Sequence, residues 1–418
     1  MSILIKNTRL NNSETDILII DDRITEIGCD IQKSTNTVID GRDTSVIPSF
    51  INAHSHSAMT YFRGYGDDMN LMEWLQTKIW PNETRLTEEL VYLGARLACL
   101  EMIRSGITFF NDMYWYPRGV ARAVDEMGMR SAVNAVFIDM FDLERAKEQI
   151  TGNERLFEEF NQYSSKVFMA LGPHAIYTVS EHSLRWAADF AKSHDLMLQI
   201  HLSETEQEVN DCQSKHGVSP IQYLDNIGFL SNKVVAAHCV YVSNEDIKIL
   251  AGNGVHVAYN PISNMKLSVN KQFPYPEFVD AGVNICLGTD GVSSNNNHSM
   301  FDSMKTAALL QKHHNDPTCL PARDCFNMAT INGYECFGLD GGVITEGKLA
   351  DLALIRLDVP EMIPCHDLYS NLVYSANSHC VDTVICGGDI LMRDGKVRNE
   401  TVIMDEFKAG LRSFLLSD

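Results

Sequence analysis

Two histidines separated by one residue follow an apolar run near the start of the chain. His54 ends the run 46–54, "VIPSFINAH", and His56 stands two residues later. Residues i and i+2 of a β-strand point to the same face, so a strand here would aim both imidazoles in one direction. Neutral imidazole is a good ligand for zinc and for ferrous iron. The pair alone is a weak signal, and two ordinary loop histidines are the alternative.

Two later apolar runs end in side chains that would complete a metal site. The run 196–201 ends at His201 and the run 283–290 ends at Asp290. Three imidazoles and one carboxylate leave a divalent ion one open position for water, as in catalytic metal sites. We predict one divalent ion, either zinc or ferrous iron. Its predicted ligands are His54, His56, His201 and Asp290.

Two further side chains are placed to move protons beside such an ion. Glu204, three residues after His201, can turn back over the bound water and remove its proton. The alternative for Glu204 is a solvated carboxylate at a helix start, where the helix dipole favours it. His238, next to last in the run 234–239, can orient the water, unless it is a satisfied buried histidine. Asp290 precedes Gly291, so an ordinary turn role is its alternative.

These side chains need a scaffold that gathers the ends of separate strands. Short apolar runs alternate with helical patterns such as 87–106 and 180–195. Eight buried strands alternating with helices are typical of a (β/α)8 barrel, or TIM barrel, whose active site lies at the carboxyl ends of the strands. We predict this barrel over residues 50–341. The runs are 46–54, 107–112, 130–137, 166–174, 196–201, 234–239, 255–260 and 283–290.

The two ends of the chain differ from the middle. Residues 1–49 hold β-branched runs such as "TDILIIDDRITEIG", and residues 342–418 hold "KLADLALIRLD" and "DTVICGGDILMRDGKV". The glycine pair at 387–388 is a hairpin signal between two strands. Because neither end can bury a core alone, we predict that 1–49 and 342–418 pair as one small β-sandwich domain.

The composition of the chain excludes several classes of function. The net charge of −21 disfavours nucleic acid as a partner, because phosphate binding needs clustered Lys and Arg. The sequence has no run of about 18 apolar residues, so we expect no membrane span, and its start does not resemble a secretory signal. Eleven scattered cysteines without a CxxC pair indicate reduced thiols. We expect a cytoplasmic enzyme with a small-molecule substrate, assembled as a homo-oligomer.

The motifs "FINAHSH", "HLSE", "AAHC", "NPISNMKL" and "LGTDGVSSNNN" occur in this order. Together they resemble the amidohydrolase superfamily, and most closely its 5'-methylthioadenosine and S-adenosylhomocysteine deaminases and the related triazine chlorohydrolases. The resemblance covers nearly the whole chain. It implies a mononuclear metal site, usually zinc, on the four ligands named above. It also implies Glu204 as general acid and base and His238 as the residue that orients or activates water.

The same resemblance suggests residues for substrate binding. Glu83, in "PNETRL", matches a carboxylate that holds ribose hydroxyls, and Trp74 lies on the preceding segment. His174, in "GPHAIYT", matches a residue near the substrate tail. Homocysteine-binding members carry an arginine where this chain has Ala135, which disfavours S-adenosylhomocysteine because bidentate arginine is the usual anchor for a carboxylate. Arg145 is a second candidate anchor for such a tail.

The function expected from these residues is hydrolytic deamination of an aminated heteroaromatic ring. An adenine nucleoside such as 5'-methylthioadenosine, 5'-deoxyadenosine or S-adenosylhomocysteine is the expected substrate. The same metal and water could instead displace chloride, an amine or a thioether from a triazine-like ring. A binuclear amidase would need a carboxylated lysine near the end of the fourth strand, where the sequence reads "LGPH" and offers Lys166 only at the beginning. A catalytically inactive scaffold is the last alternative.

Overall fold

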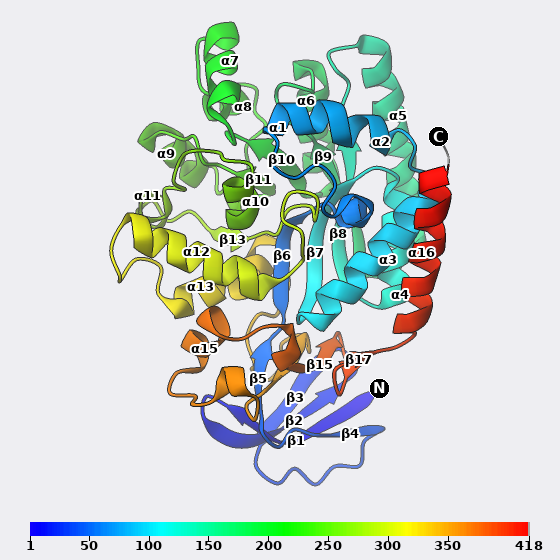
Figure 1. Cartoon of the computed structure of the whole chain (residues 1–418), viewed down its shortest axis with the longest axis vertical. Helices are drawn as coiled ribbons and strands as arrows, with labels where there is room; N and C mark the ends of the chain where they lie inside the picture. Colours follow the sequence, from blue (N-terminus) through cyan, green and yellow to red (C-terminus); the bar gives the residue numbers. More distant parts are fainter. Residues whose placement is uncertain (417–418) are drawn as a thin grey trace.

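The computed structural model describes residues 1–416 and contains two β-sheets, of which the upper one is surrounded by helices (Figure 1). The upper sheet has eight parallel strands, each beside the next in the sequence. The backbone N–H of Asp290, just beyond the last strand, donates to the carbonyl of His54 in the first at 3.0 Å. The sheet therefore closes on itself as a (β/α)8 barrel, and all eight predicted strands are confirmed. The strands are β6 (Phe50–Ser55), β7 (Ile107–Tyr114), β8 (Arg130–Phe137), β9 (Val167–Pro173), β10 (Leu198–Leu202), β11 (Val234–His238), β12 (His256–Tyr259) and β13 (Ile285–Leu287).

The barrel interior is filled at one end and polar at the other. Side chains from the early parts of the strands form a closed apolar cluster, capped by Tyr334 and Phe337 of the chain that follows the barrel. The side chains of each strand alternate between the two faces. The inward-facing positions that follow this apolar cluster, toward the carboxyl ends of the strands, therefore carry the polar groups. The cluster within the barrel contains Ile51, Ala53, Phe109, Ala132, Ala170, Val235, Ala258 and Cys286.

Helices cover the outside of the barrel, and they begin where capping side chains allow. The Thr87 hydroxyl accepts from the N–H of Leu90, and the Ser180 hydroxyl accepts from the N–H of Ser183, which confirms the two helices predicted near these residues. Within residues 1–416, no helix is long and apolar enough to cross a membrane. Around the barrel lie α1 (Leu71–Trp74), α2 (Trp80–Glu83), α3 (Glu88–Arg104), α4 (Pro117–Met127), α5 (Leu143–Glu159), α6 (Glu181–His194), α7 (Glu206–His216), α8 (Pro220–Asn226), α9 (Asn244–Gly252), α10 (Pro261–Lys266), α11 (Tyr275–Asp280), α12 (Met300–His314), α13 (Ala322–Met328) and α14 (Ile331–Cys336).

The lower sheet is built from both ends of the chain. It has nine strands and a separate isoleucine-rich core, and β14 pairs with β5 through Leu354 and Val46. The hairpin predicted at 387–388 joins β15 to β16. The strands are β1 (Ser2–Leu10), β2 (Ser13–Ile20), β3 (Arg23–Gly28), β4 (Thr37–Asp40), β5 (Thr44–Pro48), β14 (Leu352–Arg356), β15 (Val381–Cys386), β16 (Asp389–Arg393) and β17 (Lys396–Val397).

The apolar run 46–54 belongs to both sheets. Its first residues end β5 at Pro48, and its remainder begins β6 at Phe50. Proline has no N–H to donate to a continuing ladder, so a strand ends readily there. Ser49 lies between the two strands, and its N–H donates to the carbonyl of Asp351 at 3.2 Å. The run therefore carries the chain from the terminal sheet directly into the strand that holds the first two histidines.

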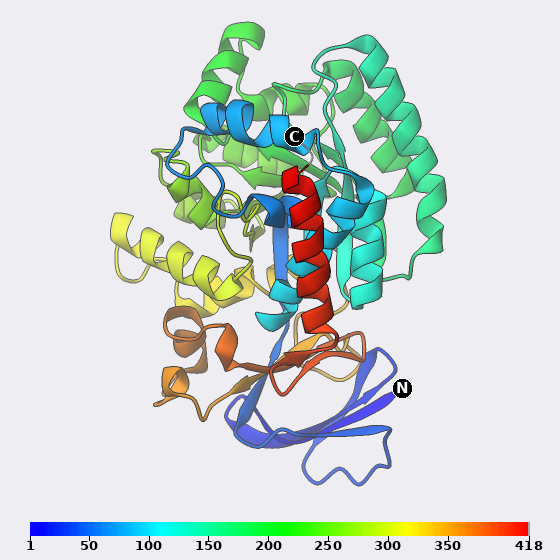
Figure 2. The same cartoon turned by 45° about the vertical axis from the view of Figure 1, so that its right-hand side comes forward.

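The last helix, α16 (Glu400–Leu416), leaves the terminal sheet and packs along α3 of the barrel (Figure 2). Phe407 packs against Tyr61 with ring centroids 4.6 Å apart and the rings tilted by 39°, and Arg96 of α3 forms an ion pair with Glu406. The buried residues Ile403, Phe407 and Phe414 recur at helical spacing and form the stripe that faces the barrel. The short helix α15 (Leu368–Tyr374) likewise packs on α12 and α13.

A buried ion pair joins the two sheets. Arg130, at the start of β8, donates through Nε to Asp351 Oδ2 at 2.8 Å, and both side chains are less than one tenth exposed. Asp351 also accepts from the backbone N–H of Gly387. Removing one partner of a buried pair leaves the other charge without compensation.

Replacing Asp351 with alanine is expected to lower the free energy of unfolding by about 3–5 kcal/mol, because Arg130 would remain buried and unpaired. Urea unfolding followed by circular dichroism measures the change. The matched control is Asp405→Ala, which removes a carboxylate that is 65% exposed and pairs with Lys408. Its expected cost is below about 1 kcal/mol. Similar losses in the two variants would contradict a structural role for the buried pair.

Candidate metal centre and active site

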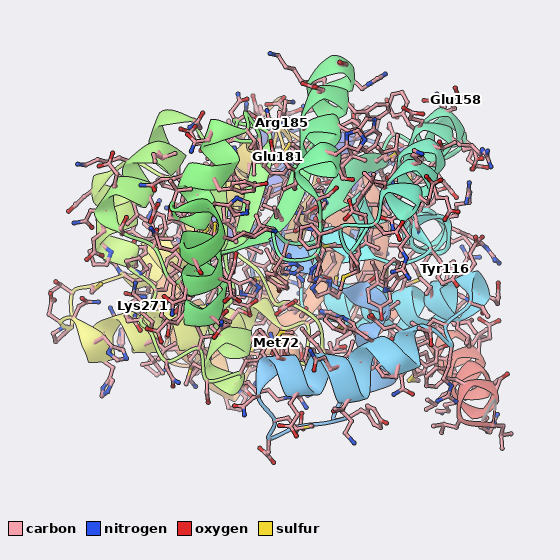
Figure 3. The ribbon with its side chains drawn as sticks, turned by 90° about the horizontal axis from the view of Figure 1, so that it is seen from above. Met72, Tyr116, Glu158, Glu181, Arg185 and Lys271 are labelled. Atoms are coloured by element: carbon pink, nitrogen blue, oxygen red, sulfur yellow. The ribbon has the colours of Figure 1, made fainter. Side chains whose placement is uncertain are left out.

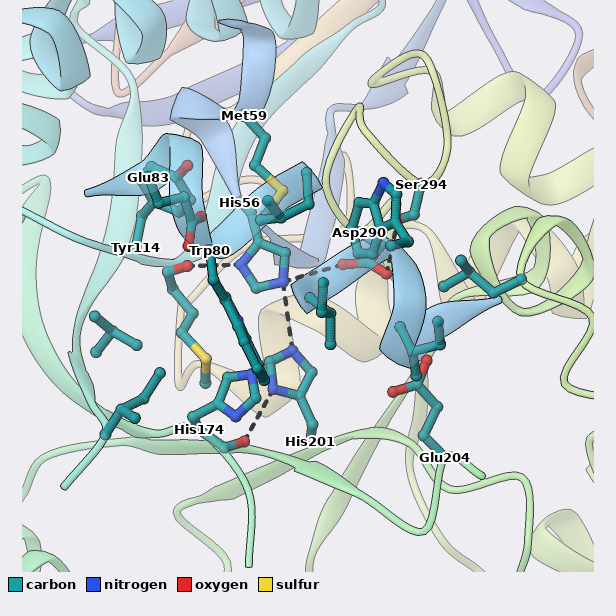
Figure 4. A pocket seen from close by; sticks show the side chains of 18 of the residues that line it. His56, Met59, Trp80, Glu83, Tyr114, His174, His201, Glu204, Asp290 and Ser294 are labelled. Atoms are coloured by element: carbon teal, nitrogen blue, oxygen red, sulfur yellow. Dashed lines mark hydrogen bonds and ion pairs between the residues drawn. The ribbon is translucent and has the colours of Figure 1, made fainter. Parts of the chain in front are cut away.

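The four predicted metal ligands converge at the carboxyl ends of the barrel strands, and Figure 4 shows three of them, His56, His201 and Asp290, side by side. Asp290 Oδ1 lies 3.3 Å from His54 Nε2 and 3.1 Å from His56 Nε2, and His201 Nε2 lies 3.3 Å from His56 Nε2. Gly288 allows this approach, because a Cβ there would meet the His54 Cβ at 2.9 Å. Residues far apart in the sequence therefore present four donor atoms to one point.

Hydrogen bonds on the far side of each ring determine which nitrogen of the histidines carries the proton. In His54, His56 and His201, Nδ1 faces an oxygen that can only accept. Each Nδ1 must therefore hold the hydrogen, and each Nε2 directs a lone pair into the centre. The accepting oxygens are Gln199 Oε1 at 2.9 Å, the Met113 carbonyl at 2.6 Å and the His174 carbonyl at 2.9 Å.

The donor set fits a divalent cation. His54 Nε2 is fully buried and has no hydrogen-bond partner among the described residues. Several lone pairs and a carboxylate directed at one point repel one another unless a cation lies between them. The donor atoms of His54, His56 and Asp290 all lie within 4.8 Å of one another, as do those of His54, His201 and His238. Nitrogen and carboxylate donors in this number suit zinc or ferrous iron.

The carboxylate of Asp290 dominates the electrostatics of the centre. Burial opposes its charge, but the imidazoles of His54 and His56, whose Nε2 atoms lie 3.3 and 3.1 Å from Oδ1, hold the pKa of Asp290 well below its usual range. Burial likewise disfavours a charge on His56, yet Asp290 raises the pKa of His56 to about 9. A divalent cation needs the neutral imidazole, so its binding displaces a proton from this group. Ser263 and Ser294 donate to the second oxygen of Asp290 at 2.6 and 3.2 Å.

Glu204 and His238 lie together beside the cluster. Glu204 Oε1 is 3.7 Å from His238 Nδ1, and both side chains are buried. Burial and the nearby charge of Asp290 raise the pKa of Glu204 to about 8, so this carboxyl can hold and release a proton near neutral pH. His238 Nδ1 also faces Asn264 Oδ1 at 2.8 Å, in the "NPISNMKL" motif.

The backbone at three of these strand ends is strained. Ser203, His238 and Asp290 have φ values of +50°, +75° and +62°, the left-handed region that non-glycine residues rarely adopt. Such conformations persist only where the surroundings hold them, and they concentrate at active sites. The carbonyl of Ser203 accepts from the N–H groups of Val240 and Tyr241 at 3.0 and 2.8 Å.

A buried carboxylate that the sequence did not single out holds the turn before the predicted base. Glu208 Oε1 accepts from the N–H of Ser203, and Oε2 accepts from the N–H of Glu204, both at 2.9 Å. Glu208 is only 5% exposed, although it lies in the first turn of α7. The Thr205 cap with an acidic residue three positions later is a capping-box pattern, which is the signal that could have identified it.

Replacing Glu208 with glutamine is expected to lower kcat by about 10–100-fold with little change in KM or in bound metal, because an outer partner that orients a reacting group has effects of this size. The amide keeps only one accepting oxygen for two N–H groups. Steady-state kinetics and metal analysis test this. The exposed neighbour Glu206, changed to glutamine, is the control. A change in KM alone, with kcat unaffected, would contradict the positioning role.

A cavity opens above the metal cluster. Glu83 and Glu204 lie on opposite sides of His56 and His201 (Figure 4). Glu83 Oε2 accepts from Trp115 Nε1 at 3.1 Å, and burial raises the pKa of Glu83. The lining contains the predicted residues Trp74, Glu83, His174, Glu204 and His238, and also Trp80, Tyr114 and Trp115, which were not predicted. Trp115 directly follows β7, a position at the carboxyl end of a strand that could have identified it.

Three other residues lie away from this cavity. Ala135 packs in the core outside the barrel, whereas Val136 and Ile138 of the same chain segment line the cavity. Arg145 is exposed in the first turn of α5, where Asp142 accepts its backbone N–H, and it does not line the cavity. Lys166 lies at the start of β9 and donates to Asp389 at 2.6 Å. It is therefore not placed to bridge two metal ions.

Known proteins of similar sequence cover nearly the whole chain. The chain is 47% identical over 403 residues to 5-methylthioadenosine/S-adenosylhomocysteine deaminase 1 of Archaeoglobus fulgidus, with 95% of both chains covered. It is 44% identical over 412 residues to the 5'-deoxyadenosine deaminase of Methanoregula boonei, covering 97% of this chain and 93% of that protein.

Known structures of similar fold include a zinc-bound adenosine deaminase from Xanthomonas campestris. It superposes with a TM-score of 0.92 at 29% identity and covers 99% of this chain and 98% of its own. Atrazine chlorohydrolase from Arthrobacter aurescens superposes with a TM-score of 0.90, but at 24% identity this likeness shows the fold alone. The profile of the amidohydrolase family matches residues 45–391. With the barrel, the histidine and aspartate cluster and these matches together, the chain belongs to the amidohydrolase family.

Proposed function

We propose that this protein is a metal-dependent aminohydrolase that removes the exocyclic amino group of an adenine nucleoside as ammonia. The observation that carries the proposal is the grouping of Glu204 and His238 beside the metal donors, at the floor of a cavity whose other side holds Glu83. The named activities of the relatives from Archaeoglobus fulgidus and Methanoregula boonei support the same reaction and ring.

We propose zinc as the metal, held by His54, His56, His201 and Asp290. The zinc in the similar adenosine deaminase structure supports this choice. A divalent ion on these donors lowers the pKa of a coordinated water toward neutrality. His238 is left out of the ligand set because it also faces Glu204 and Asn264, which suits a group that acts on water and substrate.

The residues of the chain then divide the proton transfers. Glu204 takes a proton from the attacking water and delivers it to the ring nitrogen next to the carbon that bears the amino group. The water oxygen adds to that carbon while His238 orients it. A proton passed through Asp290 to the amino group lets it leave as ammonia, and the ring keeps the oxygen. One water is consumed for each ammonia released.

Glu83 is proposed to hold the ribose hydroxyls, with Trp74, Trp80 and His174 around the nucleoside. Replacing Glu83 with glutamine is expected to raise KM for adenosine derivatives about 10–100-fold with a smaller change in kcat, because a hydrogen bond to a charged group is worth about 1.5–3 kcal/mol. With the 2'-deoxy analogue as substrate, the KM values of the wild-type and Glu83→Gln enzymes should differ much less. An equal loss on both substrates would contradict a role in ribose binding.

Ammonia release from a panel of aminated purines, nucleosides, pterins and triazines tests the proposed reaction. We expect turnover of adenosine derivatives and conversion of their adenine to hypoxanthine, identified by mass spectrometry. Chloro- and alkylthio-triazines serve as the competing substrates. Release of chloride or alkylthiol without any ammonia would contradict the proposal.

A further inference from the structure

A second cavity of about 570 Å³ adjoins the active-site cavity and shares four lining residues with it: Trp80, Glu83, Trp115 and Ile138. We call it the tail cavity. Its other lining residues are Thr84, Tyr116, Met140 and Thr178. A nucleoside whose ribose lies against Glu83 would direct the substituent on its 5' carbon from the shared wall into this space. The tail cavity thus borders the proposed site and is made mostly of aromatic and aliphatic side chains.

The loop that carries Met140 is built at an energetic cost. Met140 and Phe141 have φ values of +50° and +62°, which are strained for residues with a side chain. The fully buried carboxylate of Asp139 holds the loop: it accepts from the N–H of Phe141 at 2.8 Å and from the N–H of Ser180 at 3.0 Å. The hydroxyls of Ser180 and Ser183 also donate to it. This network keeps the Met140 side chain, which is 48% exposed, at the tail cavity.

Tyr116, which also lines the tail cavity, is strained in the same way. Its φ is +52°, and its side chain is 42% exposed just before Pro117 starts α4. In Figure 3, which looks onto this face, Met72 lies near one end of the blue helical segment and Tyr116 towards the other. Two strained positions therefore expose large apolar side chains at one opening, where water would otherwise favour polar ones.

The charge around the tail cavity does not suit an anionic substituent. Among the described residues, no lysine or arginine lines either cavity, and the carboxylate of Glu83 lies where they meet. The nearby cationic side chains either contact another group or lie outside the lining of the cavity. Lys215 lies over the ring of Phe141, 4.3 Å from its centroid, and Arg145 is exposed beyond the lining. A carboxylate tail would enter without the bidentate partner that normally stabilises it.

We propose that the tail cavity is a subsite for bulky, uncharged, apolar 5' substituents, so that the enzyme prefers 5'-alkylthio and 5'-arylthio adenosines over nucleosides with a charged amino-acid tail. The proposal rests on the proposed deamination of adenine nucleosides. A volume of about 570 Å³ exceeds what a methyl or methylthio group fills, which is why the preferred class extends to larger apolar groups.

Ammonia release from four substrates tests the subsite: 5'-deoxyadenosine, 5'-methylthioadenosine, 5'-phenylthio-5'-deoxyadenosine and S-adenosylhomocysteine. We expect kcat/KM for the phenylthio compound to equal or exceed that for the methylthio compound. We expect it to exceed that for S-adenosylhomocysteine by at least about tenfold, the discrimination that an apolar pocket typically provides.

Met140→Lys places a cation at the tail cavity with an unbranched side chain of similar length. It is expected to reduce the preference for phenylthio over the charged tail by about tenfold. The tail-less substrate 5'-deoxyadenosine should be deaminated with an efficiency within about threefold of the wild-type value. Met72→Lys is the matched control, because Met72 is also exposed, at 42%, on the same face but lines neither cavity. This control should keep the wild-type preference.

The possible failures are distinguishable. If no adenosine derivative releases ammonia, the proposed reaction and the subsite are both overturned. If 5'-deoxyadenosine is deaminated but the phenylthio compound is excluded, or S-adenosylhomocysteine is preferred, only the subsite is overturned. An Arg145→Ala variant is made in parallel. A selective loss of S-adenosylhomocysteine turnover of about tenfold or more in that variant would make Arg145 a tail anchor and would likewise overturn it.

Discussion

Replacing His201 with alanine is expected to remove the metal from the protein and to lower deaminase turnover by at least about 10³-fold, because a bound divalent ion is what lowers the pKa of the attacking water toward neutrality. His201 supplies one of the Nε2 lone pairs directed at the centre, and its Nδ1 proton is held by the His174 carbonyl. The remaining donors would bind the ion weakly. Elemental analysis and steady-state kinetics measure the two effects, and chelation of the wild-type enzyme should reproduce the kinetic one.

Two measurements separate loss of the ion from loss of folding. Zinc at about 100 times its Kd should stabilise the wild-type protein by about 2.7 kcal/mol and should not stabilise the His201→Ala variant. His182→Ala is the matched control, because His182 is an exposed histidine in the first turn of α6. It should retain metal and activity. Full metal content in the His201 variant would contradict the proposed ligand set.

Changing Glu204 to glutamine is expected to lower kcat by about 10²–10⁴-fold, the usual contribution of a general acid and base, while leaving the metal in place. The amide has nearly the shape of the carboxyl but cannot accept the proton of water and pass it to the ring. The native Glu204 carboxyl is suited to hold that proton because it is buried beside His238 and its pKa is raised. Because it is not a proposed ligand, bound metal should match the wild type.

Glu206→Gln is the matched control, because it makes the same chemical change two residues away at an exposed position. It should alter kcat by less than about twofold, as for a surface position. Solvent isotope effects on kcat give a second measure, because the wild-type value should reflect proton transfer through Glu204. A Glu204→Gln enzyme with near-normal turnover would remove this residue from the mechanism.

The barrel strands and the site candidates could be predicted because both have local signals. Each buried strand is a short apolar run, and a polar residue at its carboxyl end in such a barrel faces the active site. This pattern identifies His54, His56, His201, Asp290 and Glu204, and the structure brings all five to one end of the barrel. Strand periodicity also explains why the two histidines of "HSH" share a direction.

Features that depend on contacts between distant segments were not predictable in the same way. Apolar patterning alone does not show that Pro48 divides the run 46–54 between two sheets, or that α16 returns to pack on α3. Nor does it show the face of each strand position: Ala135 packs outside the barrel, and Val136 lines the cavity instead. A shift of one residue reverses the face, and register is set by pairing with neighbouring strands.

The sequence alone therefore identifies which residues react, because the type of each side chain and its position at the end of a strand are local properties. Three features arise only in the folded protein: the proton positions of the histidines, the raised pKa of Glu204, and the hydrogen bonds that Glu208 accepts from the N–H groups of Ser203 and Glu204. These depend on burial and on partners that lie far away in the sequence, such as Gln199 for His54. A low-dielectric interior makes such partners decisive, because it strengthens each charge and hydrogen bond that water would otherwise weaken.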